Sequence, residues 1–248
     1  MGRTVSNNIY LSLVVLYALL TVLYVFLPFP NILPVSTSQL PAPKPVIALV
    51  SALGVFVIYG ALGFLGLLLS RKLGFTDVWD KKITNKQRFG LPVIIGAGCG
   101  VFFIVADSIV SRFSNFGPLP HPPFPTSLVA SATAAIGEEI IFRLFFISFW
   151  TWLISYILFR KKHLNTIFWI VSVFSAIAFA LGHIPSIMIL KGFSSPVQIP
   201  MIVIGEMLLL NGIVSFFAAY YFKKLGLLAA VGIHFWTDIV WHVVFGLF

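Results

Sequence analysis

Seven long apolar runs dominate this sequence and restrict it to very few folds. They fall at Ile9–Pro28, Val46–Ser70, Phe89–Val110, Thr126–Phe159, Leu164–His183, Pro200–Phe222 and Leu225–Phe248. About 20 apolar residues in a helix cross a hydrocarbon core of about 30 Å, where unpaired backbone groups find no water. Charged residues make up 9% of the chain, too few to cover a soluble globule. We therefore predict an all-α, polytopic transmembrane helical bundle of about seven spans, and we exclude a soluble enzyme, a disordered chain and a disulfide scaffold.

The fourth run is longer than one span needs. Thr126–Phe159 holds 34 residues, which reach about 51 Å as a single α-helix, against a core of about 30 Å. The helix must tilt, protrude or break near Trp150. A break into two full spans would give eight spans and would reverse the orientation of everything that follows.

The net charge of +9 reflects cations that lie in the gaps between apolar runs. With seven spans, one side of the membrane receives twelve cations and the other side receives three. The twelve are Arg3, Arg71, Lys72, Lys81, Lys82, Lys86, Arg88, Arg160, Lys161, Lys162, Lys223 and Lys224, and the three are Lys44, Arg112 and Lys191. This asymmetry predicts an integral, multi-pass protein of the cell membrane with a cytoplasmic N-terminus. The cations form no contiguous patch, so membrane lipid is the expected partner and nucleic acid is not.

Five of the seven acidic residues lie inside apolar segments: Asp107, Glu138, Glu139, Glu206 and Asp238. A charge at the centre of a spanning helix costs about 2.5–3.5 kcal/mol on insertion scales, so such residues are candidates for function. They are also expected to face the interior of the bundle and to find partners there.

The stretch from Glu138 to Arg143 contains the densest group of charges within an apolar run. Glu139 and Arg143 are spaced i,i+4 and meet on one helix face, where pairing compensates both charges. Glu138 is rotated by about 100° from Glu139 and has no local partner. A desolvated carboxylate of this kind is suited to act as a general base, although an ion cluster that only locks two helices together fits the same residues.

Two further polar groups lie in apolar helices: His183 at the end of one, and the pair His234 and Asp238 within the last. His183 follows Phe179 by one turn, so the phenyl ring can brace an imidazole that is suited to proton transfer. His234 and Asp238 share one face of the last helix. The aspartate either orients the histidine for donation to an oxyanion, or both hold a metal ion, or the two form a structural hydrogen bond.

The remaining buried acids are expected to have structural partners or a share in proton transfer. Asp107 lies near a span end, where it can pair locally with Arg112 or reach the interface. Glu206 lies in the middle of its span near Asn211, which fits substrate contact, a proton relay or an interhelical hydrogen bond.

Two histidines and a tryptophan outside these groups also have expected places in the structure. His242 follows His234 by eight positions and can extend the same site. Trp241 is expected to anchor the helix at the membrane interface. His121 lies in a proline-rich loop, Pro118–Pro125, and is expected to be solvated.

Four of these residues together provide the groups that a hydrolase needs: Glu138, His183, His234 and Asp238. They offer a base to activate water, a second group for proton transfer, and donors for a tetrahedral intermediate. Two rival classes fit the same residues. One is a non-catalytic immunity or scaffold protein that uses the cluster for packing or partner binding. The other is a small proton-coupled transporter, although no inverted repeat is present in the sequence.

At three places the sequence resembles the CPBP or ABI family of intramembrane proteases, which includes the type II CAAX prenyl endopeptidases. The first family motif is two adjacent glutamates with an arginine four after the second, as in Glu138, Glu139 and Arg143. The second is a phenylalanine with a histidine four later, as in Phe179 and His183. The third is a histidine followed four later by Asn, Asp or a small residue, as in His234 and Asp238. The resemblance makes 126–248 a catalytic core, to which 1–125 adds N-terminal spans, within a single domain over 1–248.

The resemblance implies an intramembrane endopeptidase that acts on a peptide or protein substrate. Glu138 and His183 would activate water, His234 and Asp238 would stabilise the oxyanion, and Glu139 and Arg143 would form the scaffold. The implied substrate is a prenylated C-terminal CAAX segment or a small hydrophobic peptide, and bacterial members are also linked to bacteriocin immunity. That branch often carries Asn where this chain has Asp238, and an ionised Asp must orient His234 or be protonated. The implied mechanism needs no cofactor, and a divalent metal such as zinc is the alternative.

Overall fold

A computed structural model describes residues 2–27 and 42–248 as helices and loops, with no strand in these ranges. Seven helical stretches are long and apolar enough to cross a membrane. They are Gly2–Phe26, Lys44–Lys72, Lys86–Phe113, Thr126–Leu158, Leu164–Lys191, Met201–Leu225 and Leu227–Leu247. The prediction of an all-α bundle with about seven spans is therefore confirmed. The predicted end of the first span at Pro28 lies outside the described residues.

Each stretch is built from α-helices, several of which continue into π-helical (η2, η3, η5, η6 and η8) or 3₁₀-helical (η4, η7 and η9) turns. The α-helices are α1 (Gly2–Phe26), α2 (Lys44–Gly54), α3 (Gly60–Lys72), α4 (Leu91–Val110), α5 (Thr126–Glu138), α6 (Ser148–Thr151), α7 (Leu164–Leu181), α8 (Ile184–Lys191), α9 (Met201–Leu225) and α10 (Leu227–Asp238). The other turns are η2 (Val55–Tyr59), η3 (Lys86–Gly90), η4 (Ser111–Phe113), η5 (Glu139–Ile147), η6 (Trp152–Leu158), η7 (Pro196–Gln198), η8 (Ile239–Val244) and η9 (Phe245–Leu247).

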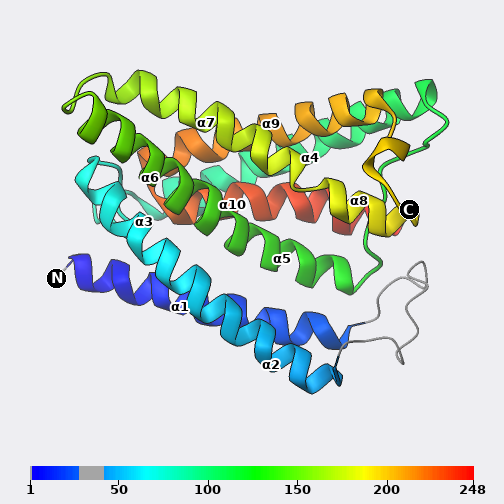
Figure 1. Cartoon of the computed structure of the whole chain (residues 1–248), viewed down its shortest axis with the longest axis horizontal. Coiled ribbons are helices and arrows are strands. Elements are labelled where there is room, and N and C mark those ends of the chain that lie inside the picture. The colour runs from blue at the N-terminus through cyan, green and yellow to red at the C-terminus, as the bar shows by residue number, and fades with distance from the viewer. Residues whose placement is uncertain (1, 28–41) are drawn as a thin grey trace.

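The helix α10 lies at the centre of the bundle, where it packs against α4, α5 and α9 (Figure 1). Its approach to α4 depends on Gly96, because a Cβ there would collide with the carbonyl oxygen of Ile233. The chain ends near the point where α8 ends and α5 begins, and we call this the C-terminal end of the bundle. The connections after α3 and before α7 lie at the opposite end, and together with the adjoining ends of α3 and η3 they carry nine of the sixteen lysines and arginines.

The long fourth run is one continuous helical segment from Thr126 to Leu158, without a break at Trp150. No proline or glycine occurs between Glu138 and Phe159, so nothing in the sequence interrupts the helix there. The bundle accordingly has seven spans and not eight within the described residues.

The fifth span continues beyond its predicted end at His183. The helix α7 ends at Leu181, and α8 then starts with Pro185 in its first turn and runs to Lys191. Proline is tolerated there because the N–H that it lacks has no partner inside a helix. His183 is therefore held at a helix junction within the span, eight positions before the end of that span.

Candidate active site

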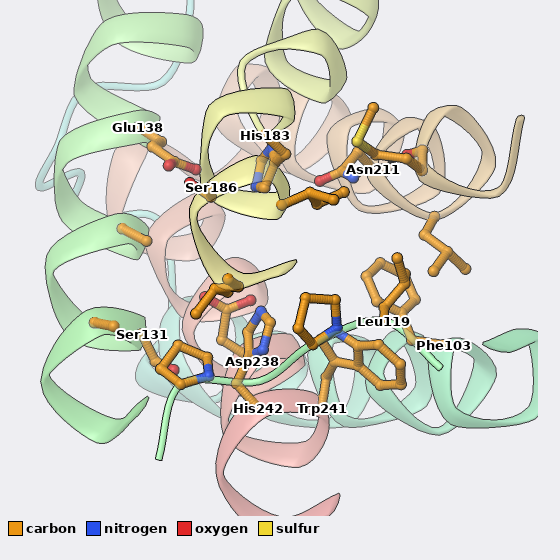
Figure 2. A pocket seen from close by; sticks show the side chains of 18 of the residues that line it. Phe103, Leu119, Ser131, Glu138, His183, Ser186, Asn211, Asp238, Trp241 and His242 are labelled. Carbon is orange, nitrogen blue, oxygen red and sulfur yellow. Dashed lines mark hydrogen bonds between the residues drawn. The ribbon is translucent and has the colours of Figure 1, made fainter. Parts of the chain in front are cut away.

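A cavity of about 300 Å³ lies among α5, the α7–α8 junction, α9 and α10 (Figure 2). Glu138, His183, His234 and Asp238 all line it. The walls are otherwise mostly apolar, with Phe103, Leu119, Ile187, Met207, Leu210 and Trp241 among the lining residues. The structure thus brings the four residues that were predicted to carry out hydrolysis to one cavity. Glu139 and Arg143 are not among its lining residues.

Glu139 joins two of the predicted motifs behind the cavity wall. Its Oε2 lies 3.2 Å from Nε of Arg143, and its Oε1 lies 2.9 Å from Nδ1 of His234. All three side chains are buried. Since a carboxylate can only accept, Nδ1 of His234 donates to Glu139, and this bond fixes the orientation of the ring.

The other ring nitrogen of His234 faces two carboxyl groups. Its Nε2 lies 3.7 Å from Oε2 of Glu138 and 3.6 Å from Oδ2 of Asp238. Both separations exceed a direct hydrogen bond. Asp238 is therefore on the Nε2 side of the imidazole, and the partner that orients the ring through Nδ1 is Glu139.

His183 is held in a defined tautomer by its own helix. Its Nδ1 lies 2.9 Å from the carbonyl oxygen of Phe179, which can only accept, so Nδ1 carries the proton of the neutral ring. The lone pair of Nε2 is left as an acceptor. The ring of Phe179 packs edge-on against both His183 and His234, with centroids 4.9 Å and 5.5 Å apart, and the guanidinium of Arg143 lies 4.7 Å from its centroid. The expected bracing of His183 by Phe179 is confirmed.

Changes of helical winding occur beside two of the cavity acids. Glu138 is the last residue of α5 before the π-helical turns of η5, and Asp238 is the last residue of α10 before those of η8. Such insertions in α-helices are frequently found at functional sites, because they re-aim side chains from their regular positions.

Continuation of the fifth span also puts the site residues at similar depths. Measured from the C-terminal end of the bundle, Glu138 lies 12 positions from Thr126 and His183 lies 8 positions from Lys191. His234 lies 13 positions from Leu247 on the same measure. A span that ended at His183 would have left this residue at the membrane boundary, far from the two others.

Ser215 is a site residue that the sequence did not indicate. It is buried on α9, and its Oγ accepts a hydrogen bond of 2.8 Å from Nη2 of Arg143. A lone serine in an apolar helix carries no signal of such a role. Ser215 thereby links α9 to the chain of polar contacts that runs from Arg143 through Glu139 to His234.

The two other membrane-embedded acids belong to a separate cluster. Asp107 is buried, and its Oδ1 accepts a bond of 2.9 Å from the backbone N–H of Leu119. The expected local pairing with Arg112 is therefore wrong, because the proline-rich loop folds over Asp107 and supplies its partner. Glu206 lies beside Asp107 where α9 packs against α4, which makes it an interhelical contact, and it does not line the cavity. Asn211 does line the cavity and donates to the carbonyl oxygen of Met207.

Two expectations for aromatic and imidazole side chains are corrected. Trp241 is buried and stacks on Phe245, so it is a core residue and not an interface anchor. His121 is not a solvated loop residue, because its Nδ1 lies 3.0 Å from Nδ1 of His242 and its ring packs against Trp241 at 4.6 Å. Burial lowers the pKa of His121 to about 4. His242 lines the cavity, as the alternative of an extended site predicted.

Within residues 2–27 and 42–248, no group of three or more His, Cys, Asp or Glu side chains is placed to hold a metal ion. In the cluster itself, Nδ1 of His234 and Nδ1 of His183 are engaged by Glu139 and by the backbone.

Comparison with known proteins supports the resemblance read from the three motifs. Residues 120–240 match the family model of the type II CAAX prenyl endopeptidase Rce1-like family. Neither curated proteins nor solved structures gave a significant match. The matched range contains all six predicted site residues, whereas the lining residues on α1 and α4 and the lining residues Trp241 and His242 of η8 lie outside it. Over residues 120–240, this chain is therefore similar to the Rce1-like type II CAAX prenyl endopeptidase family.

Proposed function

We propose that this chain is an intramembrane endopeptidase that cleaves a prenylated peptide near its C-terminus. The observation that carries the proposal is the convergence of Glu138, His183, His234 and Asp238 on one cavity inside membrane-spanning segments. A cluster that served only to lock helices would have no need of an enclosed space beside its acids. The family match supports a peptidase of this class.

In the proposed reaction, Glu138 and Nε2 of His183 hold a water molecule between them. Glu138 takes one proton from the water, and the oxygen attacks the carbonyl carbon of the scissile peptide bond. The π electrons of the carbonyl move to its oxygen and form a tetrahedral oxyanion. When the oxyanion collapses, the C–N bond breaks and Glu138 returns the proton to the leaving nitrogen. The products are a carboxylic acid and an amine, and one water molecule is consumed.

Glu139 and Arg143 position the site without touching the substrate. Glu139 accepts from Nδ1 of His234 and is itself paired with Arg143, so the imidazole faces the cavity with Nε2. His234, protonated on both nitrogens among the three carboxyl groups that face it, then donates from Nε2 to the oxyanion, and Asp238 steadies the Nε2 side of the ring. No step in this scheme requires a metal ion.

The substrate class can be tested with the purified chain in liposomes. We expect it to release the last three residues of a farnesylated peptide that ends in a CAAX sequence, detected by mass spectrometry, and to act at least about tenfold less on the unfarnesylated peptide, since the prenyl group concentrates substrate in the bilayer. EDTA should leave the rate within about twofold. Equal cleavage of both peptides would contradict the prenyl preference, and full inhibition by EDTA that zinc reverses would contradict the metal-free scheme.

A further inference from the structure

A second pair of histidines lies beside the hydrolytic cluster. His121 in the loop before α5 and His242 in η8 approach each other through their Nδ1 atoms, which are 3.0 Å apart. A hydrogen bond between two nitrogens requires a proton on one and a lone pair on the other. One ring therefore carries its proton at Nδ1 and the other does not.

The surroundings of His121 decide which ring is the donor. Its Nε2 is buried and has no hydrogen-bond partner. A proton there would leave an orphaned N–H, and buried N–H groups without partners are rarer than under-satisfied acceptors. The lowered pKa of His121 keeps this ring neutral at pH 7, so it has one proton to place. That proton is at Nδ1, and His121 donates to His242.

The tautomer of His242 follows from this bond. A neutral ring that accepts at Nδ1 must carry its proton at Nε2. His242 lines the cavity with Asp238, one turn earlier, and is close enough to His183 and His234 for their charges to act on it. In Figure 2, His242 and Asp238 lie on the side of the cavity opposite His183.

The other groups around the cavity leave a need for such a donor. Glu138 and Asp238 offer acceptors when ionised, and Nε2 of His183 is an acceptor. His234 supplies one donor to the oxyanion, because its Nε2 lies 3.6 Å and 3.7 Å from two carboxyl oxygens and so is not held in a direct hydrogen bond. A second N–H aimed at the oxyanion strengthens such a site, and an ionised Asp238 cannot provide it.

The geometry points to Nε2–H of His242 as a hydrogen-bond donor to the oxyanion, with its tautomer fixed by His121. This inference rests on the proposed peptidase function and adds to it a catalytic residue outside the three motifs. His121 acts through His242 and is a positioning residue.

Glutamine and asparagine substitutions separate donation from a merely structural contact. The amide nitrogen of glutamine can reach the place of Nε2, whereas that of asparagine can reach only the place of Nδ1. On the farnesylated peptide we expect His242→Asn and His242→Leu to lower kcat by about 10²–10³-fold, the usual effect of losing one oxyanion donor. We expect His242→Gln to stay within about tenfold of the wild type, and KM to change by less than about threefold throughout. His163→Leu, a change at an exposed histidine of the opposite end, is the matched control.

The pattern of activities would overturn the proposal in two ways. Full activity in His242→Leu would remove any role in the reaction. Activity retained in His242→Asn but lost in His242→Gln would show that His242 serves only to hold His121 and its loop.

The tautomers of His121 and His242 can be measured without substrate. The result does not depend on whether the chain is a peptidase. Nitrogen NMR of the chain labelled with ¹⁵N-histidine should show His242 protonated at Nε2 and His121 protonated at Nδ1, with peaks assigned by single substitutions. A proton on Nδ1 of His242 would overturn the donor assignment even if the chain cleaves peptides. A wild-type chain that shows the expected tautomers but cleaves neither peptide would overturn the proposed function and the oxyanion role together.

Discussion

Glu138→Gln is expected to lower kcat on the farnesylated peptide by about 10²–10⁴-fold, the range for loss of a general base. The amide has almost the same size as the carboxyl group but cannot take a proton from water. Glu138 makes no direct hydrogen bond to His234, whose Nε2 is 3.7 Å away, so the fold should survive the change. Product release measured by mass spectrometry gives the rate, and thermal unfolding in detergent reports the fold.

Glu206→Gln is the matched control for this prediction. It makes the same chemical change within the membrane, at an acid that contacts Asp107 and does not line the cavity. We expect this variant to retain the wild-type rate. If Glu138→Gln cleaves as fast as Glu206→Gln, then Glu138 is not the base, and the carboxyl group beside the cavity serves another purpose.

Arg143→Met is expected to cause the largest loss of stability, about 3–5 kcal/mol in the free energy of unfolding. Arg143 and Glu139 are 1% and 0% exposed, with 3.2 Å between Nε and Oε2. Removal of the cation leaves the carboxylate buried with His234 as its remaining partner. The bond from Arg143 to Ser215 on α9 is lost as well. Unfolding in detergent, followed by heat or denaturant, measures the effect.

Two further variants identify the buried charge as the cause. Arg112→Met removes a cation from an exposed position and should change stability by less than about 0.5 kcal/mol. The double variant Glu139→Gln/Arg143→Met should be more stable than Arg143→Met alone, because the uncompensated charge is gone. Equal stability of Arg143→Met and Arg112→Met would show that the ion pair contributes nothing to the fold.

Local spacing predicted those parts of the site that lie on one helix. The pairing of Glu139 with Arg143 and the packing of Phe179 against His183 follow from the i,i+4 period, and both are present. The seven spans follow from run length and hydropathy in the same way. These features depend on neighbours within one turn, which a sequence displays directly.

Contacts between distant segments could not be predicted by such spacing. The bond from His234 to Glu139 joins positions 95 apart, and the bond between His121 and His242 joins positions 121 apart. The expectation that His121 is solvated was wrong, because the sequence does not show that its loop folds back over Trp241. Asp107 likewise finds its partner in that loop and not one turn away at Arg112.

The convergence of α5 and α10 on one cavity can be tested without any substrate. In a Cys99→Ala background, which removes the single native cysteine, Glu138→Cys and Asp238→Cys would place two thiols beside His234. Because both acids lie within 3.7 Å of Nε2 of His234, the two thiols and the imidazole should bind Cd²⁺ together. We expect Cd²⁺ to protect both cysteines from maleimide in the double variant, and to protect neither in the single variants or when His234→Ala is added. Equal labelling of the double variant with and without Cd²⁺ would show that these side chains do not meet, and the proposed active site would be wrong.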